Sequence, residues 1–423
     1  MTASKFIVIP ILTCVLLLID WYVWQAIKVV IQNQSPFIQE VFKWLFWSVT
    51  IIIIVGLWSY NFMNPDLLGV KLRTFILSSL FISYGSKLFS IVFILIDDIS
   101  RLFIWSKNKI LPNKETVETL VDNSMAISRS EFLMKTALFA AAIPAGVLTW
   151  GILSGAHDYR IRRIRLVLKN LPKSFEGMTI AQISDIHTGS FFNRTAVKGG
   201  VEMLLKQKPD MVFFTGDLVN NRADEVKEYI DIFDKIKAPL GVYSTLGNHD
   251  YGVYTGWPNL QAKNTNLNNV KKAHKVLGYD LLLDENRTIT LGGDILAIIG
   301  VENISANESL FLNNGNLSKA IERTDDAAVK LLLSHDPTHW DKEVNSKFKD
   351  IDVTFSGHTH GSQFGINIGD KSYSPSQITY EQWAGLYKKE NQQLYVNRGF
   401  GYLGYPGRVG MPPEITIFEL VSS

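Results

Sequence analysis

The sequence predicts an α/β domain preceded by an all-α membrane domain of four transmembrane helices. The first 157 residues hold four long apolar runs, and 47% of the 423 residues are hydrophobic. After His157, short apolar runs alternate with polar stretches of helix length. Buried strands read as continuous aliphatic and β-branched runs, so this alternation is typical of an α/β sandwich. We therefore expect one domain at residues 1–157 and a second at residues 158–423.

The four apolar runs are each close to the roughly 20 residues that cross a hydrocarbon core as a helix. They cover residues 6–27, 45–62, 74–96 and 136–154. Tryptophan and tyrosine stand near several of their ends, as is common at membrane interfaces, whereas buried helices of a soluble core are the alternative for the shorter runs. Asp20 and Lys87 are ionisable groups inside these runs, so they are candidates for function or for snorkelling to a span end.

The side of the membrane is indicated by one motif only, because Lys and Arg counts on the two sides nearly balance. Ser128–Lys135 resembles a twin-arginine export signal in which one arginine is replaced by serine. This motif favours an extracytoplasmic second domain in a protein of a bacterial inner or plasma membrane. A basic flank of an ordinary helix is the alternative, and a cleaved export signal is the alternative for the fourth run.

Charge and cysteine content each bear on the class of protein. A formal net charge of +2 is too small to indicate a nucleic-acid binder, so we expect no nucleic-acid partner. Cys14 is the single cysteine, which excludes an intrachain disulfide framework.

Five apolar runs of the second half each end in a polar motif. The runs are Met178–Ser184, Met211–Thr215, Gly241–Leu246, Val329–Ser334 and Ile351–Ser356. The motifs that follow them are Asp185-Ile186-His187, Gly216-Asp217, Gly247-Asn248-His249-Asp250, His335 and Gly357-His358-Thr359-His360. In open α/β sheets the functional site forms beyond the carboxyl ends of the strands. We therefore expect these motifs to meet at one edge.

The residue types of these motifs predict a two-metal hydrolytic centre. Asp, Asn and His hold pairs of divalent transition ions, and five of the chain's 8 histidines fall in these motifs. Each motif alone has a structural alternative, such as a strand-end turn or, for Gly-Asn, left-handed backbone. Their joint order after successive strands favours the metal site.

The order of the motifs resembles that of the calcineurin-like metallophosphoesterases over nearly all of residues 158–423. Leu171-Pro172, Gly361 followed by Gln363, and Asn397-Arg398-Gly399 are similar to the bacterial membrane-associated branch of that family. The resemblance implies a four-layer α/β/β/α sandwich and a metal-dependent phosphoesterase.

Carried over residue by residue, the resemblance implies the ligands of two metal ions. The first ion would be held by Asp185, His187 and His360. The second would be held by Asn248, His335 and His358. Asp217 would bridge both, as a carboxylate does when two ions clamp a phosphoryl oxygen. These mixed ligands suit Mn, Fe or Zn, and we favour Mn.

His249 stands next to the predicted ligand Asn248, so it is the candidate general acid for the leaving oxygen. We expect Asp250 to orient its imidazole. Arg398 and Arg408 lie in a Gly- and Pro-rich tail and are candidates to grip a phosphate, with surface arginines as the alternative. His157, His274 and His339 fit no motif and are read as structural or solvated.

Two segments have open interpretations. The aromatic stretch Tyr251–Trp257 is either a platform beside the metals or a surface loop that packs on itself. Arg160–Arg165 either binds anionic lipid head groups or forms an edge strand with exposed arginines.

The predicted activity is hydrolysis of a phosphodiester or pyrophosphate bond at a membrane. The substrate expected from the resemblance is phosphorylated and lipid-linked or UDP-linked, of the UDP-2,3-diacylglucosamine type that occurs in lipid A synthesis. One alternative is a membrane receptor or scaffold that retains the fold without turnover. Another is a phosphoprotein phosphatase.

Overall fold

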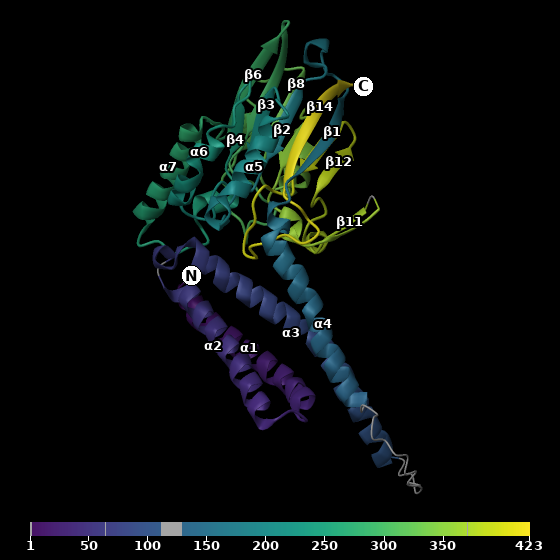
Figure 1. The fold of residues 1–423 in the computed structure, drawn as a ribbon. Coiled ribbons are helices and arrows are strands. Elements are labelled where there is room, and N and C mark those ends of the chain that lie inside the picture. Colours follow the sequence, from purple (N-terminus) through teal and green to yellow (C-terminus); the bar gives the residue numbers. More distant parts are fainter. Residues whose placement is uncertain (1, 64, 111–128, 370) are drawn as a thin grey trace. The chain divides into compact units, whose positions relative to one another are not determined.

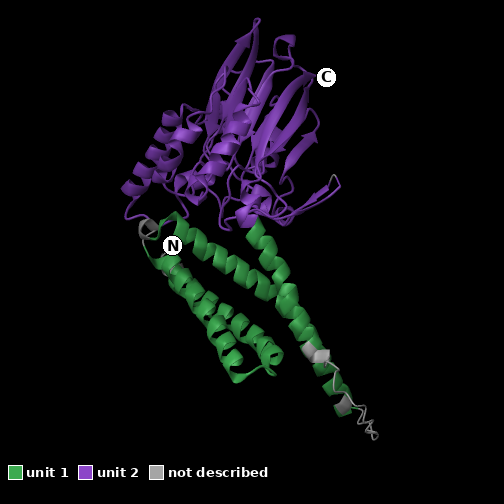
Figure 2. Ribbon diagram, in the orientation of Figure 1, with its two compact units in different colours: residues 1–150 green, residues 151–423 purple. Residues whose placement is uncertain are grey.

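The computed structural model describes residues 2–63, 65–110, 129–369 and 371–423. It divides into two compact units, Met1–Trp150 and Gly151–Ser423 (Figure 2). The first unit is all-α and the second is α/β, so the predicted fold class is confirmed. Ser128, the first residue of the export-like motif, lies outside the described residues.

The first unit consists of long helices. They are α1 (Thr2–Ile31), α2 (Pro36–Phe62), α3 (Pro65–Ile110) and α4 (Arg129–Leu153). Helix α2 begins where Ser35 Oγ accepts the N–H of Ile38 and Pro36 fixes the first turn. Helix α3 is interrupted at Gly69, whose φ of 61° is left-handed.

Each of these helices carries a stretch long and apolar enough to cross a bilayer. The stretches are Lys5–Ile31, Pro36–Phe62, Leu68–Lys107 and Phe132–His157. A chain with four such helices is a multi-pass membrane protein.

Asp20 and Lys87 meet inside the first unit. The Lys87 Nζ lies 2.5 Å from Asp20 Oδ1, and the Tyr84 hydroxyl donates to Asp20 Oδ2 at 2.7 Å. The ammonium also lies 5.0 Å from the ring centroid of Phe46. Asp20 is fully buried, so pairing between α1 and α3, rather than snorkelling, accommodates its charge.

The second unit contains two six-stranded sheets (Figure 1). The first has the order β1 (Arg160–Leu168), β14 (Glu414–Ser422), β2 (Thr179–Ile183), β3 (Met211–Thr215), β4 (Val242–Thr245) and β5 (Asp280–Leu281). The second has the order β12 (Gly385–Lys389), β13 (Gln392–Val396), β9 (Val353–Ser356), β8 (Val329–Leu333), β7 (Asp294–Gly300) and β6 (Glu285–Leu291). A separate hairpin pairs β10 (Ile366–Ile368) with β11 (Lys371–Tyr373).

Three apolar cores separate four layers. Alternate residues of the strands, such as Phe213 and Phe355, meet between the two sheets. The outer face of the first sheet is covered by α5 (Arg194–Leu205), α6 (Ile230–Phe233) and α7 (Leu260–Leu277). The outer face of the second packs against α8 (Leu317–Ala320) and the helical turns that run from Trp340 to α9 (Asn345–Lys347). This is the predicted α/β/β/α sandwich.

The five predicted strands are present as β2, β3, β4, β8 and β9. The segment between β3 and β4 begins as a 3-10 helix over Ala223–Tyr229 and continues as the short α6. Its start is held by the Glu225 carboxylate, which accepts the N–H groups of Asn220 and Arg222. Arg160–Arg165 lies in the edge strand β1, as the second of its two interpretations expected.

Candidate metal centre

The predicted ligands lie on loops at the carboxyl ends of parallel strands. β2 pairs with β3, and β8 pairs with β9, so Asp185 and Asp217 from the first sheet face His335 and His360 from the second. Glycines make this approach close. A Cβ on Gly357 would lie 2.2 Å from Asp185 Oδ2, and one on Gly247 would lie 2.2 Å from Asp217 Oδ1. The glycines of these motifs are therefore required by packing.

The backbone at the site is strained. Five predicted ligands adopt left-handed φ angles, which non-glycine residues rarely do: Asp185 at 51°, His187 at 50°, Asp217 at 58°, His358 at 72° and His360 at 52°. Such conformations cost free energy and persist where the surrounding structure enforces them, most often at functional sites.

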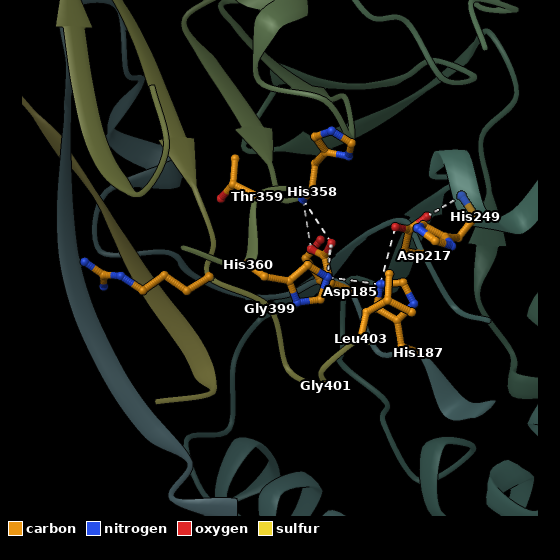
Figure 3. A network of polar contacts seen from close by, with 12 residues as sticks. Asp185, His187, Asp217, His249, His358, Thr359, His360, Gly399, Gly401 and Leu403 are labelled. Atoms are coloured by element: carbon orange, nitrogen blue, oxygen red, sulfur yellow. Dashed lines mark hydrogen bonds and ion pairs between the residues drawn. The ribbon is translucent and has the colours of Figure 1, made fainter. Parts of the chain in front are cut away.

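Two overlapping groups of side chains have ligand atoms within 4.8 Å of one another, and Figure 3 shows Asp185, His187, Asp217 and His360 of these groups. The first is Asp185, His187 and His360, and the second is Asp185, Asp217 and His335. His360 Nε2 lies 3.2 Å from Asp185 Oδ1 and 3.0 Å from His187 Nε2. All of these residues are buried.

The hydrogen bonds around two histidines show that their free nitrogens face a carboxylate. His335 Nδ1 lies 2.7 Å from the Thr215 carbonyl and must donate to it. Its Nε2, 3.2 Å from Asp217 Oδ2, is then the nitrogen that can bind a metal ion or, without one, a proton. His187 Nδ1 is engaged by Asn220 Oδ1 at 3.1 Å, and its Nε2 lies 3.5 Å from the same carboxylate oxygen. These acceptors need a cation between them, so the residues fit a divalent metal ion.

The pKa values of His335 and Asp217 also indicate that this cluster requires a positive charge. Burial alone would lower the pKa of His335, but the Asp217 carboxylate raises it to about 10. Burial alone would raise the pKa of Asp217, but the imidazoles of His335 and His249 hold it well below its ordinary value. Without a metal ion, a proton takes the place of the cation.

Asn248 and His358 form a pair beside this cluster. His358 Nδ1 lies 2.9 Å from Asn248 Oδ1, and the backbone N–H of His358 donates to both Asp185 oxygens at 3.0 Å. Its ring points away from Asp185 in Figure 3. The structure therefore groups His335 with Asp185 and Asp217, and it places Asn248 and His358 next to one another.

His249 lies at the edge of the cluster. Its backbone N–H donates to Asp217 Oδ1 at 2.9 Å, and its Nδ1 lies 2.9 Å from the Asn220 carbonyl. Its ring packs against Tyr254, with centroids 4.4 Å apart. Burial lowers its pKa, and the Asp217 carboxylate partly offsets this. The Asn220 carbonyl thus engages Nδ1 and fixes the orientation of the ring.

Asp250 does not orient His249, which corrects the expectation from the sequence. Its carboxylate accepts the backbone N–H groups of Asp217, Leu218 and Gly247 at 2.9 Å each. Burial and the Asp217 carboxylate raise the pKa of Asp250 to about 7. Asp250 thus fixes the loop that carries Asp217, and the Asn220 carbonyl orients the His249 ring.

Arg398 and Arg408 are committed to protein acceptors. Arg408 is 1% exposed and donates to the carbonyls of Gly401, Met411 and Arg398. Arg398 Nη1 pairs with Glu414 Oε2 at 3.0 Å. These contacts give no support to a phosphate grip, because both arginines are buried and the Arg408 guanidinium lies 3.3 Å from His360 Nδ1.

Three polar residues at the site were not singled out from the sequence. Asn220 holds His187, and its only signal is its place three residues after Asp217. Asp336 Oδ2 lies 3.7 Å from His358 Nε2, and its signal is adjacency to His335. Tyr380 lies 2.9 Å from the same nitrogen through its hydroxyl, and no sequence pattern marks it.

The three histidines outside the motifs have structural surroundings. His274 Nδ1 lies 2.9 Å from Ser244 Oγ, and His339 lies between Ser334 and Glu343. The ring of His157 packs against Phe192, with centroids 5.2 Å apart.

The strand-end loops with their buried carboxylates and imidazoles define a metal-dependent hydrolase. Residues 178–362 match the family described as calcineurin-like phosphoesterase, and residues 4–156 match the family described as probable calcineurin-like phosphoesterase, transmembrane domain. The chain belongs to the calcineurin-like metallophosphoesterases, as a member with a four-helix membrane domain. It is therefore an enzyme of the phosphoesterase class.

Curated relatives agree with this assignment. An uncharacterized metallophosphoesterase of Bacillus subtilis, YkuE, is 29% identical over 70% of this chain and 99% of its own length. A transmembrane protein with metallophosphoesterase domain from Bos taurus is 29% identical over 63% of this chain, which spans 58% of that relative. UDP-2,3-diacylglucosamine pyrophosphatase LpxG of Chlamydia trachomatis is 27% identical over 67% of this chain and 96% of its own length.

Proposed function

We propose that the chain is a two-metal phosphohydrolase that cleaves a phosphodiester or pyrophosphate bond of a membrane-associated substrate. The observation that carries the proposal is the pair of acceptors at 3.2 Å, His335 Nε2 and Asp217 Oδ2, inside a buried cluster. Such a pair is stable when a proton or a metal ion lies between the two atoms, and a metal ion would also engage the neighbouring Asp185 carboxylate. The left-handed backbone of the neighbouring ligands supports a site held in place for binding.

We assign the ligands as the family resemblance implies. One ion would be held by Asp185, His187 and His360, and Asp217 would bridge to the other ion. The second ion would be held by Asn248, His335 and His358. When bound, two ions of this kind, with Mn²⁺ favoured, would polarise a phosphoryl oxygen and make a water molecule more acidic. The hydrogen bonds to Asn220 and Thr215 support this assignment, because they engage Nδ1 of His187 and His335 and turn Nε2 of both rings toward Asp217.

His249 is proposed to protonate the leaving oxygen. Its Nδ1–H donates to the Asn220 carbonyl, so Nε2 is the atom that would carry the transferred proton. Burial lowers the pKa of His249, and a bound phosphate anion next to Nε2 would favour the protonated ring. Asp250 supports the reaction indirectly, through the loop of Asp217.

An amphiphilic substrate is supported by the membrane spans and by the aromatic residues at the site. The rings of Tyr254 and Phe311 lie 4.4 Å from His249 and 4.7 Å from His358. The name of the Chlamydia relative supports a pyrophosphate in a UDP-linked, acylated sugar as the substrate type. We further propose an extracytoplasmic catalytic domain, which the export-like motif at Ser128–Lys135 supports.

The test of the proposed function is hydrolysis of an aryl phosphodiester by the purified full chain loaded with Mn²⁺. Asp217→Asn and His358→Ala should abolish turnover, while Asp325→Asn, a matched change at an exposed position, should retain it. Full activity of both site variants would overturn the two-metal assignment. A parallel assay on a detergent-solubilised UDP-diacylglucosamine would identify the substrate class.

The proposed topology has its own test. A periplasmic-type reporter fused after Ser423 should be active, and a reporter that is active only in the cytoplasm should be silent. The opposite pair of results would place the catalytic domain on the cytoplasmic side.

A further inference from the structure

The hairpin β10–β11 and the short helix α10 (Ser376–Thr379) expose large apolar side chains. The exposed fractions are 66% for Ile366, 66% for Ile368, 47% for Tyr373 and 90% for Ile378. Together with Lys371, these residues form what we call the hairpin surface. Exposed apolar groups gathered on one small element often mark a contact with a partner or a membrane.

The apolar face of the hairpin is turned outward and its polar face is turned to the protein, which is the reverse of the usual arrangement in water. Ile366 pairs with Tyr373, and Ile368 pairs with Lys371, so their side chains share one face. The other face holds Asn367 and Ser372, which bond to each other at 2.7 Å. Asn367 also donates to the Gly410 carbonyl at 2.8 Å. The polar face is thus tied to the protein, and the apolar face is open.

No third strand covers this hairpin among the described residues, because β10 and β11 form a two-stranded sheet of their own. Figure 1 shows the hairpin projecting from the sandwich of the catalytic unit. A two-stranded hairpin alone is only marginally stable in water. Its open apolar face therefore calls for a covering surface.

The base of the hairpin lies next to the end of the fourth membrane span. Within the unit Gly151–Ser423, the N–H of Arg408 donates to the Gly151 carbonyl at 3.0 Å. The adjoining residue Val409 accepts the N–H of Gly365 at 2.9 Å, one residue before β10. The fourth span runs from Phe132 to His157 and so includes Gly151. One short segment thus contacts both the end of the span and the start of the hairpin.

We propose that the hairpin surface inserts into the interface of the bilayer that holds the transmembrane helices. The neighbourhood of the span end places this surface at the membrane boundary. Isoleucine and tyrosine suit the boundary between head groups and acyl chains, and Lys371 on the same face suits anionic lipid phosphates. The occupant is the lipid surface itself, so the inference does not rest on the identity of the substrate.

The hairpin surface is also joined to the metal centre. Ser374 Oγ, just after β11, donates to the Gly361 carbonyl at 2.7 Å, and Ser376 Oγ in α10 lies 2.7 Å from Ser362 Oγ. Two residues after Ile378, the Tyr380 hydroxyl lies 2.9 Å from His358 Nε2. Docking of this surface would therefore bring lipid head groups beside the site.

The test uses the full chain in lipid nanodiscs of phosphatidylcholine and phosphatidylglycerol. Cys14 is replaced by alanine, and single cysteines are introduced as Ile368→Cys or Ile378→Cys and labelled with an environment-sensitive fluorophore. Thr290→Cys is the matched control on another hairpin. Thr290 is exposed and pairs with Ile295 near the start of β7, at the end of the sheet away from the metal centre. The readout is quenching by nitroxides placed near the head-group end of the acyl chains.

Labels at positions 368 and 378 should lose about half of their fluorescence, as expected for side chains some 5–10 Å into the interface, and the label at 290 should not. Adding Ile366→Asp should weaken quenching at 378. The two labelled sites lie on separate elements, so misfolding of one variant leaves the other informative. Quenching equal to that at Thr290→Cys would overturn the proposal. So would a result in which a second copy of the chain, rather than lipid, shields the labels from solvent. This experiment does not measure turnover. A negative result would therefore overturn membrane insertion of the hairpin surface without bearing on the proposed hydrolysis.

Discussion

The two units both bury charged side chains, but they neutralise them differently. In the membrane unit, Asp20 is paired with Lys87 at 2.5 Å and accepts from Tyr84 at 2.7 Å. In the catalytic unit, Asp217 has the imidazole nitrogens of His335 and His187 at 3.2 and 3.5 Å. The first carboxylate has a cation within the chain. The second has neighbours that are themselves acceptors unless they take up a proton.

This difference separates a structural charge from a functional one. A buried ion pair satisfies itself, and breaking it leaves an uncompensated charge. A buried set of acceptors is complete only when a cation arrives from solution, which couples binding to stability. Burial of a carboxylate is thus uninformative by itself. The identity of the groups that face it distinguishes Asp20 from Asp217.

The largest expected effect is on turnover. Asp185→Asn should reduce hydrolysis at least about a thousandfold, because a bound metal ion contributes several kcal/mol of charge stabilisation in the transition state. Metal content and rate, measured together on the purified chain, check this. The same measurements on Asp20→Asn should show bound metal near the unmodified level. Equal metal loss in both variants would erase the distinction between the two carboxylates.

The next effect is on stability of the membrane unit. Asp20→Asn leaves Lys87 buried without its partner, so the free energy of unfolding should fall by about 3–5 kcal/mol. Chemical unfolding in detergent, followed by tryptophan fluorescence, measures this. The double variant Asp20→Leu with Lys87→Met should recover most of the loss. If the double variant is as unstable as the single one, the pair contributes through packing rather than charge.

Metal removal should lower the stability of the catalytic unit and leave that of the membrane unit unchanged. Mn²⁺ at a hundred times its dissociation constant should stabilise the native state by about 2.7 kcal/mol relative to chelator. Thermal unfolding with and without chelator checks this. Asp217→Asn should abolish the Mn²⁺ response and Asp20→Asn should keep it. A response that survives in Asp217→Asn would place the stabilising ion elsewhere.

The sequence predicted those site residues that stand in motifs. It did not predict the surroundings of residues that reach the site through tertiary contacts. Strand ends and residue types were sufficient to bring Asp185, His187 and Asp217 together. Arg408 was a candidate to grip a phosphate, with a surface arginine as the alternative, because nothing local shows that carbonyls of distant loops surround it. Tyr380 approaches His358 only after the chain has folded back past α10.

The hairpin shows the same limit. Its residues alternate apolar and polar, so the pattern alone gives the two faces of β10. It does not show that the polar face, through Asn367, turns to the Gly410 carbonyl. Which face is open depends on a contact across 43 residues of chain.

The smallest expected effect comes from a histidine whose surroundings, unlike those of His335, do not supply a carboxylate. Burial lowers the pKa of His274 from 6.5 to about 3. A depressed value means that the unfolded chain takes up a proton below pH 6.5 and the native protein does not. Stability is therefore fully present above pH 6.5 and is lost as pH falls toward 3, by about 1.4 kcal/mol per pH unit.

Replacement of this ring by phenylalanine tests the assignment. His274→Phe should reduce the slope of unfolding free energy against pH by about 1.4 kcal/mol per unit between pH 6 and 5, because one titrating group is removed. Unfolding in chelator-containing buffer removes metal binding, and the titrating groups of the metal centre contribute equally to the slopes of the two chains being compared. An unchanged slope would mean that His274 titrates alike in the native and unfolded chains. A burial-depressed imidazole that packs against Phe214 is incompatible with that result, since protonation would place an unpaired charge in the core.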